Sequence, residues 1–100
     1  MQNTVKHFIR QHQLSCSVQS RYIDLISEAG ELGKEILKAT DYGKSECRPG
    51  ADLTEEAGDC LFSLLALMND LGIDAEQALQ TVLRKYERRI LRTGKPDSGR

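Results

Sequence analysis

Apolar residues recur every three or four positions along four segments of the chain, and stretches rich in glycine, serine or proline separate these segments. This period is that of an amphipathic α-helix, and no segment shows the apolar–polar alternation that is typical of a half-buried strand. The pattern predicts helices over about residues 3–13, 18 or 20 to 39, 52–71 and 74–92. We therefore expect an all-α fold whose subunit resembles a four-helix bundle.

Short capping signals mark the expected helix ends. The serine-rich stretch Ser15–Ser20 is a suitable N-cap region for the second helix. Asp52–Glu55 and Asp74–Gln77 each resemble a capping box and should open the third and fourth helices. Gly72 supplies a stop for the third helix. A chain of 100 residues suffices for one domain, so we expect a single domain over residues 1–92 and a disordered tail over residues 93–100.

The two central helices differ in their apolar surface. In the second helix a single stripe should face the core, and it consists of Tyr22, Leu25, Ala29, Leu32 and Ile36. The third helix is apolar almost all the way round from residue 60 to residue 68, and a helix of this kind is packed on every side. Three other short helices cannot easily cover it. We therefore expect a homo-oligomer whose interface uses Leu61, Leu64, Leu65 or Met68.

Charge, cysteine content and the length of the apolar runs argue against several classes of protein. The net charge of -1 gives no electrostatic reason to expect binding to nucleic acid or to a membrane. Three irregularly spaced cysteines argue against a disulfide framework and for a reducing compartment. The N-terminus lacks the apolar stretch of a signal peptide, and the longest apolar run is too short to span a bilayer. We expect a soluble cytoplasmic protein.

Two acidic pairs interrupt the apolar pattern. Glu28 and Glu31 lie one helical turn apart in the second helix, and Glu56 and Asp59 do so in the third. Like charges at such spacing repel unless a cation lies between them. Two such pairs on two helices can form an oxygen-rich pocket, and we expect it to bind Mg²⁺, with Mn²⁺ as a possible substitute. Calcium fits less well, because the chain has no EF-hand loop.

A plainer interpretation of these acids is a solvated helix surface. Lys34 and Lys38 could pair with Glu31 and Glu35, and acids near the start of the third helix favour the positive end of its dipole. The dipole explains Asp59 less well, since its effect fades beyond the first turn. Asp59 should lie at the rim of a buried helix without a cation one turn away. An unpaired carboxylate in that position is costly, which favours the metal site.

A basic segment closes the fourth helix, with Arg84, Lys85, Arg88, Arg89 and Arg92. Cations are favourable at helix C-termini without any further role. The functional alternative is that some of them bind phosphate oxygens, which arginine can contact bidentately. Lys85, Arg88 and Arg89 are the candidates for substrate binding.

The spacing Glu28-x-x-Glu31, then 24 residues, then Glu56-x-x-Asp59 resembles the signature of MazG-like nucleoside triphosphate pyrophosphohydrolases. The surrounding sequence agrees at Glu-Ala-Gly-Glu-Leu (28–32), Glu-Glu-Ala-Gly-Asp (55–59), Leu-Gly-Ile-Asp (71–74) and the basic segment 85–89. The resemblance covers about residues 18–92. It implies an all-α fold, Mg²⁺ bound by these four catalytic acids, and a dimer or tetramer.

The resemblance also implies hydrolysis of a nucleoside triphosphate to the monophosphate and pyrophosphate, often to clear unwanted nucleotides. One departure is Ser27, where the family usually has a glutamate. Two rival functions stay open. One is a non-catalytic helical oligomerisation or interaction module, and the other is a related enzyme that hydrolyses phosphoribosyl-ATP.

Overall fold

The computed structural model describes residues 1–97. These residues form four α-helices and no strand: α1 (Gln2–Gln11), α2 (Val18–Ala39), α3 (Ala51–Asp70) and α4 (Ala75–Thr93). The predicted all-α class is confirmed. Each predicted helix exists, and the observed ends lie within about two residues of those expected from the pattern.

Two of the three predicted N-cap regions contain the observed cap residue. The Ser17 side chain accepts from the backbone N–H of Ser20 at 3.1 Å, and the Asp74 side chain accepts from that of Gln77 at 2.9 Å. The predicted capping box at Asp52 is wrong. The N-cap of α3 is Gly50, which is extended, so the helix begins at Ala51 and Asp52 lies inside its first turn.

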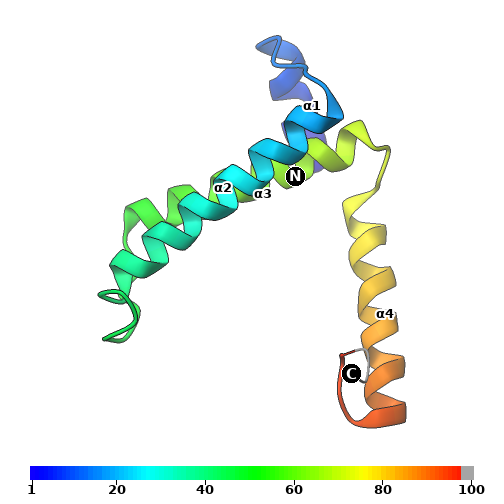
Figure 1. Ribbon diagram of the computed structural model, residues 1–100. Helices are drawn as coiled ribbons and strands as arrows, with labels where there is room; N and C mark the ends of the chain where they lie inside the picture. Colours follow the sequence, from blue (N-terminus) through cyan, green and yellow to red (C-terminus); the bar gives the residue numbers. More distant parts are fainter. Residues whose placement is uncertain (98–100) are drawn as a thin grey trace.

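Helices α2 and α3 form an antiparallel pair that lies side by side along most of its length, and α1 packs against α3 (Figure 1). The buried apolar residues are Ile9 of α1 and Leu65, Ala66 and Leu67 of α3. Phe8 meets Phe62 edge to face, with ring centroids 5.9 Å apart. The core therefore lies around the C-terminal half of α3, next to α1.

A buried arginine joins the segment before α2 to the end of α3. The Arg21 guanidinium donates to the carbonyl of Leu14 at 2.6 Å, and its Nε lies 3.5 Å from Asp70. Gln2 makes a similar connection, because its Oε1 accepts from the backbone N–H of Ala75 at 2.8 Å. These polar contacts fix the entry to α2 and the junction of α3 and α4.

Helix α4 does not close a bundle with the other three (Figure 1). It turns away after Gly72, whose φ of 68° lies in the left-handed region that glycine adopts readily. None of its residues is buried, and its apolar stripe faces solvent: Leu79, Leu83, Tyr86 and Ile90. The radius of gyration is 16.7 Å, whereas about 13 Å is usual for a compact chain of 100 residues.

The apolar stripes of α2 and α3 are only partly covered. Of the stripe predicted on α2, Leu25 and Leu32 are half-buried, whereas Tyr22, Ala29 and Ile36 are exposed. On α3, Leu61 and Leu64 are exposed. The expectation that α3 is packed on every side does not hold within one chain. The reason is the departure of α4, which leaves α1 and α2 as the main cover of α3.

Hydrogen bonds join the end of α4 to the residues that follow it. Thr93 is still helical, and its hydroxyl donates to the carbonyl of Lys95 at 3.1 Å. Residues 98–100, the end of the tail expected to be disordered, lie outside the described residues. No helix within residues 1–97 is both long and apolar enough to cross a bilayer.

Candidate metal centre

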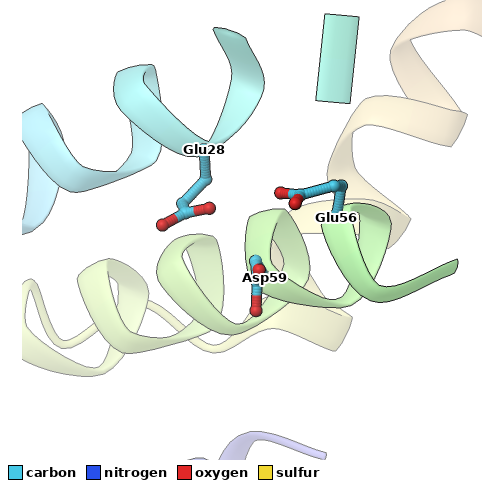
Figure 2. Close-up of side chains that lie close together, drawn as sticks. All are labelled: Glu28, Glu56 and Asp59. Carbon is cyan, nitrogen blue, oxygen red and sulfur yellow. The ribbon is translucent and has the colours of Figure 1, made fainter. Parts of the chain in front are cut away.

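Three carboxylates from two helices converge where α2 and α3 run side by side. Glu28 reaches from α2 towards α3, from which Glu56 and Asp59 project (Figure 2). One oxygen from each of the three lies within 4.8 Å of the others. The spacing of three residues places Glu56 and Asp59 on one face of α3, and the antiparallel pairing brings Glu28 opposite them.

The burial of these acids differs from the expectation. Glu28 and Glu56 are half-buried, whereas Asp59 is exposed. Asp59 was expected at the rim of a buried helix, but in the single chain it is exposed and so bears little desolvation. Glu56 is the acid whose charge is disfavoured by loss of water contact, because it is half-buried.

The electrostatics of the group centre on Glu56. Burial raises the pKa of this carboxyl above its ordinary value, and the negative charge of Asp59 raises it further. Glu31, Glu28 and Glu35 act in the same direction. A raised pKa means that the folded protein disfavours the charge on Glu56 as long as no cation compensates it.

The donor set fits a hard divalent cation. All three donors are carboxylate oxygens, and neither histidine nor thiolate belongs to the group within residues 1–97. Oxygen ligands bind Mg²⁺ at about 2.1 Å, so two oxygens on one ion lie at most about 4.2 Å apart. Side chains within 4.8 Å of one another need only small rotations to meet that limit.

The fourth predicted acid lies beside the group. Glu31 follows Glu28 by one turn on α2 and is exposed, and it is not among the three converging carboxylates. Its charge nevertheless contributes to the raised pKa of Glu56. Lys38 pairs with Glu35 at 3.2 Å, as the solvated-surface interpretation expected, whereas Glu31 forms no ion pair with Lys34 in the described residues.

The three predicted substrate-binding cations lie elsewhere. Lys85, Arg88 and Arg89 are on α4, which extends away from α2 and α3 (Figure 1). Lys85 lies over the ring of Tyr86, 5.3 Å from its centroid, and Arg89 donates to the carbonyl of Pro96 at 3.4 Å. A single chain therefore does not bring them to the three carboxylates.

Sequence reasoning missed one neighbour of the group. Cys60, which belongs to the apolar run of residues 60–68, is half-buried beside the acids. Burial raises the pKa of its thiol, and the charges of Glu28, Asp59 and Glu56 add to the effect. The sequence could have predicted this neighbourhood, because Cys60 follows Glu56 by four residues and so lies on the same side of α3.

Comparison with known proteins supports the relationship that the motifs suggest. The sequence profile described as the MazG nucleotide pyrophosphohydrolase domain matches residues 17–91. The chain is also similar to the uncharacterized protein YpjD of Bacillus subtilis (strain 168), with 37% identity over 73 residues. The aligned part makes up 65% of this chain and spans 60% of the length of that relative. No solved structure matches the chain.

Proposed function

The chain belongs to the MazG nucleotide pyrophosphohydrolase family, and on that premise we propose that it hydrolyses a nucleoside triphosphate to the monophosphate and pyrophosphate in a Mg²⁺-dependent reaction. The observation that carries the proposal is the convergence of Glu28, Glu56 and Asp59 from two helices. Hydrolytic removal of unwanted nucleotides from the cytoplasmic pool is the proposed role. The proposed catalytic domain comprises residues 1–92.

In this proposal Glu28, Glu31, Glu56 and Asp59 hold the ion. Glu31 is included because it follows Glu28 by one turn and its charge reaches Glu56. Bound Mg²⁺ would supply neutralisation of phosphate charge and activation of the attacking water. The chain's own acids keep the ion at the junction of α2 and α3. The half-buried positions of Glu28 and Glu56 limit their conformations and so orient their oxygens.

We also propose that the active form is a homo-oligomer, a dimer or a tetramer. Its support is the exposed apolar surface of α3 and α4, which includes Leu61, Leu64, Leu83 and Ile90. An apolar stripe of an amphipathic helix is normally covered by a partner, so exposed stripes on two helices favour contact with a second subunit. In an assembly, Lys85, Arg88 and Arg89 of one subunit could reach substrate bound by another, which would reconcile their predicted role with their place on α4.

The test is release of pyrophosphate from a panel of ribo- and deoxyribonucleoside triphosphates, with Mg²⁺, with Mn²⁺ and with a chelator. We expect release that requires a divalent ion and favours part of the panel. Phosphoribosyl-ATP belongs in the same panel, because cleavage of that compound alone would identify the rival enzyme. No release from any compound would leave the interaction module as the better description.

A further inference from the structure

A groove opens at the end of the α2–α3 pair, where the connecting loop joins the two helices. Its volume is about 320 Å³. Its lining comes from the last turns of α2, the end of the loop and the first turn of α3: Glu35, Lys38, Ala39, Arg48, Gly50, Ala51, Asp52 and Leu53. Among them, Lys38 and Arg48 are cations, and Glu35 and Asp52 are carboxylates.

The loop holds Arg48 beside the end of α2. The backbone N–H of Arg48 donates to the carbonyl of Ala39 at 2.9 Å, and that of Ser45 donates to the carbonyl of Thr40 at 2.9 Å. The loop therefore folds back on the helix end instead of extending into solvent. This return places Arg48 next to Lys38, although the two are separated in the sequence.

The two cations differ in their partners. Lys38 donates to Glu35 at 3.2 Å, and this bond raises the pKa of its ammonium, so Lys38 stays positively charged at neutral pH. Arg48 forms no ion pair within residues 1–97. An arginine that lines a groove and has no ion-pair partner can bind a phosphate bidentately through its guanidinium.

The groove lies next to the three carboxylates. Asp52, on its rim, precedes Glu56 by one helical turn, which corresponds to about 6 Å along α3. Glu35 lines the groove and also raises the pKa of Glu56 through its charge. An extended anion can therefore reach from the carboxylate group into the groove.

We propose that Lys38 and Arg48 bind the β- and γ-phosphates of the nucleoside triphosphate in this groove and then hold the pyrophosphate product; this assignment rests on the proposed function. In hydrolysis the water oxygen bonds to the α-phosphorus and the α–β phosphoanhydride bond breaks. The electron pair of that bond leaves on the bridging oxygen with pyrophosphate, and the water releases a proton. Two cations at the groove stabilise the charge that develops on the leaving group.

The test measures binding of inorganic pyrophosphate with Mg²⁺ by calorimetry, so it does not depend on turnover. We compare the parent with Lys38→Gln/Arg48→Gln. The matched control is Lys44→Gln/Arg10→Gln, which removes the same charge, includes a residue of the same loop and leaves the groove intact. The groove variant should bind at least about tenfold more weakly, in line with the loss of charge-assisted hydrogen bonds. The control should stay within twofold of the parent.

Product inhibition shows which part of the substrate the groove binds, the pyrophosphate or the nucleoside monophosphate. In the groove variant, inhibition by pyrophosphate should weaken while inhibition by the nucleoside monophosphate stays unchanged. The assignment would be overturned if only inhibition by the monophosphate weakened in the groove variant. It would also be overturned if the groove variant bound pyrophosphate within twofold of the parent, or if the parent did not bind pyrophosphate. If the parent binds pyrophosphate through Lys38 and Arg48 but hydrolyses nothing, the groove assignment holds and the proposed hydrolysis fails.

Discussion

A carboxylate oxygen of Glu28 on α2 lies within 4.8 Å of one of Glu56 on α3, and neither acid has an ion-pair partner within residues 1–97. Two like charges at this distance destabilise each other, and partial burial weakens the screening by water. A fold that accepts this cost is well explained by a cation that binds there.

The first prediction concerns catalysis. Glu56→Gln or Asp59→Asn removes a charge but keeps the shape of the side chain. Loss of groups that only support a metal ligand already reduces activity about 10–100-fold, so loss of a ligand itself should reduce pyrophosphate release at least about a hundredfold. Glu87→Gln on α4 is the control and should be near the parent. Activity within twofold of the parent in both site variants would refute the metal site.

The second prediction concerns the metal. An ion present at ten times its Kd stabilises the folded protein by about 1.4 kcal/mol, which corresponds to an increase in Tm of about 6–11 °C for a chain of this size. We expect such a shift with Mg²⁺ in the parent and a smaller one in Asp59→Asn, measured by calorimetry. Without metal, Asp59→Asn should melt no lower than the parent. A large loss there would mean that Asp59 has a structural partner instead.

Much of this arrangement could be predicted from the sequence, since helical periodicity and short-range spacing are local properties. The spacing of Glu56 and Asp59 determines that they share a face, and the capping residues Ser17 and Asp74 act within one turn. The convergence with Glu28 needed only the antiparallel pairing of neighbouring helices. The N-cap of α3 was predicted wrongly because Gly50, which is extended, takes that position, so Asp52 lies inside the first turn.

The course of α4 could not be predicted in the same way. Its amphipathic pattern predicts a partner for the stripe that contains Leu79 and Leu83, but the pattern does not say whether that partner belongs to the same chain. The return of the loop that brings Arg48 to the end of α2 depends on backbone bonds in an irregular segment. Backbone hydrogen bonds in an irregular loop produce no periodic pattern of residues, so the sequence does not predict them.

The third prediction is a pH dependence without metal. Because the pKa of Glu56 is raised in the folded protein, the folded state binds a proton more tightly than the unfolded state between the ordinary and the raised value. Stability from this group therefore falls as pH rises through that interval and stays lower above it. Glu56→Gln should melt higher than the parent at pH 7.5 in chelator, and the difference should shrink near pH 4. A lower Tm for Glu56→Gln at pH 7.5 would contradict the proposed repulsion.

The fourth prediction concerns assembly. One chain leaves Leu61 and Leu64 of α3 and the stripe of α4 exposed, while Leu65 is already buried within the chain. Light scattering at micromolar concentration should give a mass two or four times 11.2 kDa. Leu83→Glu, placed on the exposed stripe, should shift the mass towards the monomer without unfolding α4, because Leu83 buries little in one chain.

Thr81→Glu is the control for this experiment, since it introduces the same charge on the opposite side of α4. It should leave the mass unchanged. A monomeric parent would refute the assembly. Lys85, Arg88 and Arg89 would then have no route to the carboxylates, because a single chain keeps α4 away from α2 and α3. Loss of pyrophosphate release in Leu83→Glu, together with loss of the oligomer, would instead indicate that the partner subunit's α4 completes the site.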